Sequence, residues 1–112
     1  MIHELWIKGQ YLEQIIERRK DLEIRVGYPR VQAIKRGDQL CFKDGRGRSV
    51  LVHILDIRQY PNLSLAVGQE DPNRIAPGMG GLPLLNALGE IYPPEKERRG
   101  VYVIEFRVIS TT

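Results

Sequence analysis

The sequence predicts one α+β domain, a small and mostly antiparallel curved sheet or β-barrel of about five strands with two main helices. Several short segments alternate apolar with polar residues, as half-buried strands do. Two other segments carry apolar residues at helical spacing. Strands and helices do not alternate regularly along the chain, which argues against a parallel α/β fold.

Composition supports this class and excludes others. The 112 residues suit a single domain, here 1–112, and 42% hydrophobic with 28% charged residues argues against disorder. A net charge of +3 is a mild basic bias that is compatible with nucleic acid. The single cysteine, Cys41, excludes an internal disulfide and predicts a reducing, cytoplasmic setting. No apolar run is long enough for a membrane span, and the first residues do not resemble a signal peptide.

The first strand is predicted over His3–Lys8, where Leu5 and Ile7 alternate with polar residues. Trp6, in the same stretch, is expected to belong to the core. A helix is predicted over Tyr11–Arg19, because apolar residues recur there three and four positions apart.

Three further strands follow. Leu22–Val26 alternates cleanly and ends at a Gly-Tyr-Pro turn, after which Arg30–Arg36 is expected to form one helical turn. Gln39–Lys43 and Ser49–Tyr60 are joined by a glycine-rich hairpin loop at 44–48. The second of these strands is apolar on both faces over most of its length, which predicts a central position in the sheet or barrel.

The remaining part of the chain is less regular. Residues 61–81 are rich in glycine and proline and predict a long excursion with little regular structure, of which 68–81 is expected to be a mobile flap over the candidate site. A second helix is predicted over Leu82–Tyr92 from its apolar stripe. A charged turn at 95–100 leads into a closing strand over Val101–Ile109.

The most informative stretch joins the first helix to the strand Leu22–Val26. Alternation places the apolar residues of this strand on one face and Glu23 and Arg25 on the other, with Lys20 held close by the turn. Two cations and a carboxylate on rigid backbone suit a pocket for an anionic or nucleobase-like ligand. The simpler interpretation is a solvated strand face with one weak ion pair.

Tyr28 adds an aromatic ring to this stretch. It lies in the turn after the strand, with Arg25 before it and Arg30 after it. An aromatic ring among cations is typical of a stacking site for single-stranded RNA.

Other motifs carry no chemistry. His3, His53 and Cys41 lack the spacing of metal ligands, so no metal or cofactor is predicted, and His53 and Cys41 are expected to pack in the core. The glycines at 45–47 and 78–81 lack the strand–loop–helix and lysine context of a phosphate loop.

Four segments together resemble the ASCH domain family, which has a pattern of roughly G-x-K-x-x-E-x-R followed by a Gly-Asp turn into an apolar strand. They are Glu17–Arg25, Ile34–Phe42, Leu88–Pro93 and Val101–Phe106. The resemblance runs in order along nearly the whole chain. It implies a small β-barrel of the PUA-like superfamily, in which a cleft between barrel and helices binds RNA or a modified nucleoside.

The family pattern transfers to particular residues. Lys20, Glu23 and Arg25 match its lysine, acid and arginine. Arg18 stands where the family usually has glycine, so the left-handed end of the first helix falls on a residue that disfavours that conformation.

One branch of the family removes the acyl group of acetylcytidine with the lysine, a threonine at the position of Glu23 and a glutamate from the middle of the chain. Lys20 is kept here and Glu70 is a candidate for that glutamate, but the threonine is replaced. Without the hydroxyl the same mechanism does not follow. Another branch is proposed to cut RNA, and no residue here distinguishes that activity.

We therefore expect an RNA- or nucleoside-binding domain whose cleft contains Lys20, Glu23, Arg25, Tyr28 and Arg30. The alternatives are a small amidohydrolase acting on an acylated cytidine with Lys20, Glu23 and Glu70 as catalytic candidates, an RNA-cleaving enzyme, and a module that binds a protein partner. The residues expected to extend a basic track for an RNA backbone are Arg30, Lys35, Arg36, Arg46 and Arg48.

Overall fold

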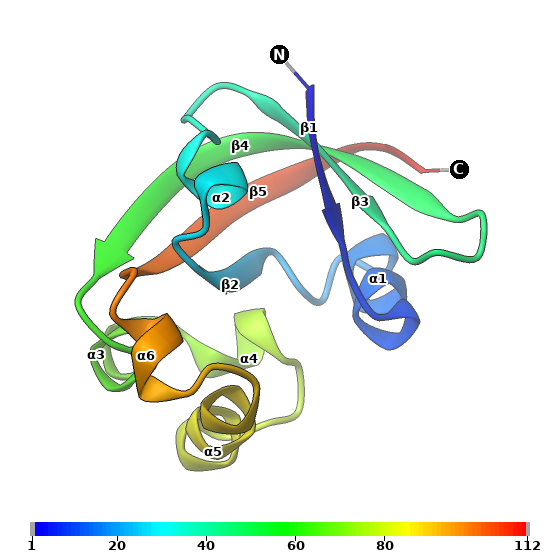
Figure 1. The fold of residues 1–112 in the computed structure, drawn as a ribbon. Helices are drawn as coiled ribbons and strands as arrows, with labels where there is room; N and C mark the ends of the chain where they lie inside the picture. Colours follow the sequence, from blue (N-terminus) through cyan, green and yellow to red (C-terminus); the bar gives the residue numbers. More distant parts are fainter. Residues whose placement is uncertain (1, 112) are drawn as a thin grey trace.

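The computed structural model describes residues 2–111, which form a curled five-stranded sheet with helices at its open side (Figure 1). The strand order is β1-β3-β4-β5-β2, with β1 parallel to β3 and the other pairs antiparallel. The strands are β1 (Ile2–Trp6), β2 (Leu22–Val26), β3 (Gln39–Lys43), β4 (Ser49–Tyr60) and β5 (Val101–Thr111). The helices are α1 (Gly9–Ile16), α2 (Pro29–Gln32), α3 (Leu63–Gln69), α4 (Pro72–Ile75), α5 (Gly81–Ile91) and α6 (Pro94–Glu97).

This architecture confirms the predicted α+β class with its curved, mostly antiparallel sheet of five strands, which curls into a half-barrel. The strands β2, β3 and β4 have the predicted bounds, and β4 is central, between β3 and β5. The pairing register of β4 with β5 shifts between Ile54 and Asp56 and again between Leu51 and Val52. Such bulges bend a strand and increase its twist. The long central pair therefore curls, and the two edge strands β1 and β2 approach each other across the open side.

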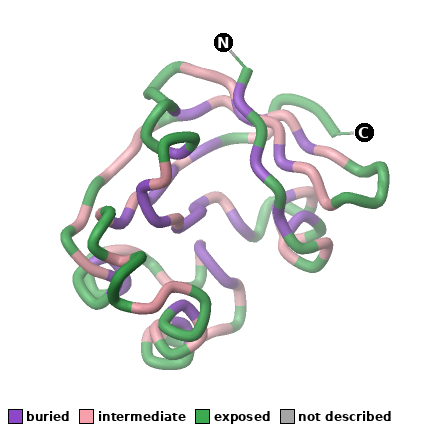
Figure 2. Tube along the Cα trace, viewed as in Figure 1, coloured by how far each residue is buried: buried purple, intermediate pink, exposed green. Residues whose placement is uncertain are grey.

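Two hydrophobic clusters fill the molecule, one on each side of β5. The first lies inside the curl, where the rings of Phe42 and Phe106 are 5.2 Å apart. The second lies under the helices α3, α4 and α5, and it includes Leu22, Ile24 and Val103. Figure 2 shows the backbone of β2 buried along almost its whole length between these two regions.

The prediction of little regular structure over 61–81 was wrong, because α3 and α4 occupy most of it. Each helix has a side-chain cap that the sequence carried: Asn62 accepts from the N–H of Leu65, and Asp71 accepts from the N–H of Asn73. Ile75 is buried in the second cluster. The segment is thus packed against the sheet, and its motion as a flap stays a prediction.

The structure corrects three expectations about single residues. In each case the cause is the alternation of inward and outward side chains along a strand. Trp6 is 59% exposed rather than part of the core, because it shares the outer face of β1 with Ile2 and Glu4. Cys41 and His53 are half-buried for the same reason, since their neighbours in β3 and β4 take the inner positions.

Helix α1 ends in a Schellman motif that is centred on Arg18. The N–H of Arg18 donates to the carbonyl of Ile15, and the N–H of Arg19 donates to the carbonyl of Gln14. Arg18 takes the left-handed conformation with φ of 65°, the only positive φ among the described non-glycine residues. The left-handed conformation that a glycine would adopt easily is therefore taken here by an arginine.

We predict that Arg18→Gly stabilises the protein by about 1 kcal/mol, because a left-handed conformation costs an L-residue roughly that amount. Arg18→Ala removes the same charge but keeps the Cβ atom, so it should give no such gain. Urea unfolding of both variants measures the difference. Equal stabilities for the two variants would show that the positive φ at this position does not reduce the free energy of unfolding.

Candidate functional site

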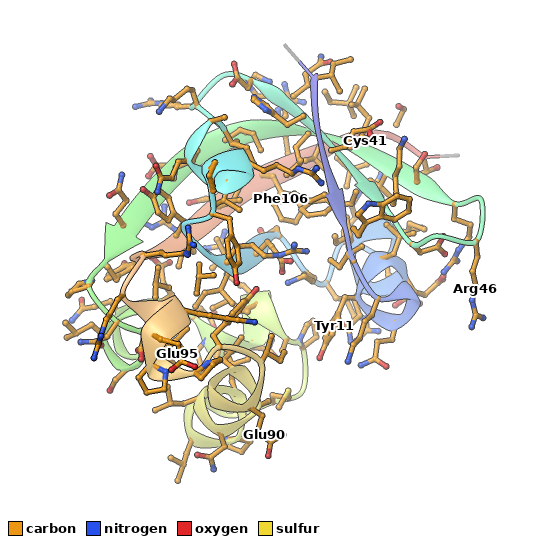
Figure 3. The ribbon with its side chains drawn as sticks, viewed as in Figure 1. Tyr11, Cys41, Arg46, Glu90, Glu95 and Phe106 are labelled. Atoms are coloured by element: carbon orange, nitrogen blue, oxygen red, sulfur yellow. The ribbon has the colours of Figure 1, made fainter. Side chains whose placement is uncertain are left out.

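A pocket of about 230 Å³ opens between the edge strand β2, the β1–α1 connection and the helices α4 and α5. It lies on the open side of the curl, where Figure 3 shows Tyr11 projecting from α1 towards the helices. Most of its wall is apolar or aromatic, while Lys8, Lys20, Glu23 and Arg25 supply its charges. The other lining residues are Trp6, Ile7, Tyr11, Ile24, Ile75, Ala76, Met79, Leu84, Ala87, Leu88, Ile91 and Tyr92.

Lys20 is the most buried charge of the site, with 2% of its surface exposed. Its Nζ atom is 2.7 Å from the carbonyl oxygen of Leu22, 2.6 Å from that of Ile75 and 2.9 Å from Oε1 of Glu23. An ammonium group has three N–H donors, so all of them are used. Lys20 therefore holds α4 against β2 and fixes the Glu23 carboxylate.

Glu23 lies between the two cations. Its Oε2 atom accepts from Nε of Arg25 at 2.6 Å, and 7% of the residue is exposed. Burial acts to raise the pKa of Glu23, but the charges of Lys20 and Arg25 and their hydrogen bonds outweigh it and lower the pKa. Glu23 is therefore a carboxylate at neutral pH. A carboxylate offers about four acceptor positions, so two remain after these contacts.

Arg25 links the two edges of the sheet. Its Nη2 atom donates to the carbonyl oxygen of Trp6 at 2.6 Å, across the open side between β2 and the end of β1. Of the five N–H groups of an arginine, this bond and the one to Glu23 use two. The other three have no acceptor among residues 2–111. Glu23 and Arg25 thus present a free acceptor beside free donors.

Aromatic rings surround these charges. The ammonium of Lys20 lies 5.7 Å from the centre of the Tyr11 ring, and Tyr92 lines the pocket from the end of α5. Burial above all raises the pKa of Tyr92. Trp6 stands exposed at the rim. A flat ring fits such walls, since aromatic faces stack on one another.

The structure brings Lys20, Glu23 and Arg25 together, but not the other candidates. Tyr28 and Arg30 do not line the pocket, and Tyr28 instead lies under the guanidinium of Arg99, 4.8 Å from its ring centre. The simpler interpretation of the stretch as a solvated strand face is wrong, because Lys20 and Glu23 are buried.

Glu70 lies elsewhere, which corrects its candidacy as the partner of Lys20. Its carboxylate accepts two hydrogen bonds from Arg58, at 2.6 and 2.8 Å, and one from the hydroxyl of Tyr60 at 2.5 Å. The bonds from Arg58 chiefly lower its pKa. Arg58 also binds Glu105, so Glu70 belongs to a charged network that joins α3 to the sheet.

Sequence reasoning missed the contributions of Trp6, Tyr92 and α4. Tyr92 could have been found from the Ile-Tyr-Pro motif, because the proline that follows Tyr92 marks the end of α5, and this end lies at the pocket. No sequence pattern could have pointed to the carbonyl of Ile75, since every residue has a main-chain carbonyl. Within residues 2–111 no three His, Cys, Asp or Glu side chains are placed to hold a metal ion. No helix in that range is long and apolar enough to cross a membrane.

We predict that Lys20→Met destabilises the protein by about 3–5 kcal/mol, because it leaves the buried carboxylate of Glu23 with one partner fewer. Adding Glu23→Gln should recover part of this loss by removing the charge. Chemical unfolding measures both. Lys96→Met, at an exposed position, is the control and should change stability by about 0.5 kcal/mol or less. An unaltered unfolding midpoint for Lys20→Met would contradict the assigned role.

Acid should weaken the folded state through Glu23. Its pKa is lower in the folded protein than its ordinary value of 4.5, so the unfolded chain binds more protons in acid. Stability from this group is therefore present above pH 4.5 and lost as pH falls from there through the folded pKa. Chemical unfolding between neutral pH and acid should show a shallower decline for Glu23→Gln than for the unsubstituted protein. If stability declined with the same slope in both proteins, carboxylates other than Glu23 would be responsible for the decline.

Comparison with known proteins agrees with the resemblance that the sequence carries. The family model of the ASCH domain matches residues 5–110. The crystal structure of the hypothetical protein PH0355 is similar over 97% of this chain and 100% of its own, with 26% identity and a TM-score of 0.88. The solution structure of protein PF0455 from Pyrococcus furiosus is 27% identical, covers 98% of this chain and 99% of its own, and has a TM-score of 0.78.

A more distant structure shows the fold alone. It is that of a mutant of ZmASCH from Zymomonas mobilis, 9% identical, with a TM-score of 0.66 over 99% of this chain and 71% of that one. No curated protein sequence matches the chain significantly. Because the family model spans residues 5–110, nearly the whole sequence, this protein belongs to the ASCH domain family.

Proposed function

We propose that this ASCH domain binds RNA by holding one nucleobase in the pocket beside Glu23 and Arg25. The observation that carries the proposal is the free acceptor of Glu23 next to the free donors of Arg25, inside an apolar and aromatic wall. The pairing edge of a base places a donor beside an acceptor, and its faces are flat and stack on aromatic rings. Base and pocket are thus complementary in hydrogen bonding and in shape.

The roles of the three charged residues differ in this proposal. Glu23 accepts a hydrogen bond from an exocyclic amine, as cytosine would offer, and Arg25 donates to the adjacent ring nitrogen or carbonyl. Lys20 positions Glu23 and does not contact the base, because its three donors are already used. The pocket volume of about 230 Å³ is below the roughly 300–1,000 Å³ of sites for larger ligands, which favours a single small ring.

The amidohydrolase alternative draws on the burial of Lys20 and Glu23, since a desolvated pocket suits catalysis. Three features weaken it. Lys20 donates to three protein oxygens and has no free position to take a proton, Glu23 has no hydroxyl, and Glu70 is bound to Arg58. Binding is therefore the better supported function.

The test is a titration with a five-nucleotide oligocytidine at low salt. Trp6 is the only tryptophan and lines the pocket, so its fluorescence reports occupancy. We predict that Glu23→Gln weakens binding by about tenfold or more, because a hydrogen bond to a charged group is lost. Glu90→Gln makes the same chemical change at an exposed residue of α5 (Figure 3) and should bind like the unsubstituted protein.

Failure of the unsubstituted protein to bind at low salt, or equal affinities of the two variants, would refute the proposal. Circular dichroism confirms that each variant is folded. The same samples are incubated with acetylcytidine and with end-labelled RNA. Turnover of the nucleoside would establish the amidohydrolase instead, and shortening of the RNA would establish cleavage.

A further inference from the structure

Four exposed cations stand in two segments that the contact of Arg99 with Tyr28 brings together: Arg30 of α2, which begins directly after Tyr28, and Lys96 of α6 with Arg98 and Arg99, which follow α6. We call them the α2/α6 basic surface. Tyr92, which lines the pocket, ends α5 and is followed after one residue by α6. The segment that carries three of these cations therefore follows the pocket wall directly along the chain.

A close backbone contact fixes this surface to the sheet. The N–H of Gly27 donates to the carbonyl of Gly100 at 2.9 Å. A Cβ atom on Gly27 would lie 2.5 Å from the carbonyl oxygen of Arg99 and 2.6 Å from the ring of Tyr102, so a larger residue does not fit. The contact brings the turn after β2 against the turn before β5. As a result the guanidinium of Arg99 stacks on Tyr28, 4.8 Å from its ring centre.

The charges of the α2/α6 basic surface are not neutralised by carboxylates. None of its four cations forms an ion pair within residues 2–111. Of the two acidic residues of α6, Glu97 turns its carboxylate to the N–H of Leu63, and Glu95 is exposed. Four cations thus stand against two carboxylates of α6, neither of which forms an ion pair with them within residues 2–111.

The cations on the other side of the pocket differ. Arg48 is bound by Glu13 at 2.5 Å and by Asp44 at 3.2 Å, and Lys43 is bound by Glu4. Arg46 is exposed and has no ion pair within residues 2–111, but Figure 3 shows it at the far tip of the β3–β4 hairpin, away from α6. Lys8, which lines the pocket on this side, is also exposed and forms no ion pair within residues 2–111, so this side offers one such cation at the pocket against four on the α2/α6 basic surface.

Resting on the proposed function, we infer that the ligand is an RNA strand rather than a free nucleoside, with one base in the pocket and the adjoining phosphates on the α2/α6 basic surface. Unpaired exposed cations gain most from phosphates, because each contact releases condensed counterions from the strand. The stack of Arg99 on Tyr28 holds a planar set of donors in place, and such a fork matches a phosphate group. Arg48 and Lys43 already have carboxylate partners, so phosphates would gain less binding free energy from them.

The experiment compares cytidine with the five-nucleotide oligocytidine across a series of salt concentrations. The oligonucleotide should bind the unsubstituted protein at least about tenfold more tightly than cytidine at low salt. The double variant Arg98→Ala/Arg99→Ala should lose about tenfold in oligonucleotide affinity. Its slope of log affinity against log salt should fall by roughly 0.7 for each phosphate contact removed. Its affinity for cytidine should not change.

Two further variants sharpen the result. Arg30→Ala leaves the Arg99–Tyr28 stack intact and should also reduce the salt slope, so the effect does not depend on a local rearrangement around Tyr28. Arg46→Ala removes an equally exposed cation at the hairpin tip and should change neither affinity nor slope. Thermal unfolding confirms that all variants remain folded under the binding conditions.

The outcomes separate this inference from the proposed function. If neither cytidine nor oligocytidine binds the unsubstituted protein, the proposed function fails and the inference fails with it. If cytidine binds as tightly as the oligonucleotide, the base pocket stands and the inference is overturned. It is also overturned if Arg46→Ala weakens oligonucleotide binding as much as Arg98→Ala/Arg99→Ala does.

Discussion

The arrangement of this domain depends on the ammonium group of Lys20. One cation satisfies a carbonyl and a carboxylate from two adjacent residues of β2, Leu22 and Glu23, and the carbonyl of Ile75 at the end of α4, which lies 55 residues further along the chain than Lys20. A charge removed from water must be fully paired, so these contacts form together or not at all. The ammonium therefore ties the helical layer to the edge of the sheet and, through Glu23, orients Arg25. Pocket geometry and fold stability rest on the same set of bonds.

Much of this could be read from the sequence, because the period of a strand assigns each side chain to a face. Alternation alone placed Glu23 and Arg25 together, and the bounds of β2, β3 and β4 followed from the same pattern. The burial of Lys20 could not be predicted, since one of its acceptors is the main-chain carbonyl of Ile75, which carries no residue signature. The caps at Asn62 and Asp71 were readable, but the surrounding glycines and prolines outweighed them.

The site and the α2/α6 basic surface use different kinds of electrostatics. In the pocket, Glu23 and Arg25 are held by fixed partners, so their remaining donors and acceptors have defined directions and can discriminate between ligands. On the surface, the cations are exposed and form no ion pair within the described part of the chain, which favours attraction of phosphates without sequence preference. The closed Glu70 network on the far side of β2 and β5 has neither property and serves to anchor α3.

The bond from Arg25 to the carbonyl of Trp6 has a kinetic consequence. Elsewhere the sheet is joined by ladders of main-chain hydrogen bonds, but across its open side, among the residues that the structure describes, one side chain bridges the two edge strands. Breaking one bond costs less free energy than separating a ladder of bonds, so we expect the two edges to part more readily than β4 parts from its neighbours. We therefore expect the main-chain amides beside this seam to exchange with solvent before those at the centre of β4.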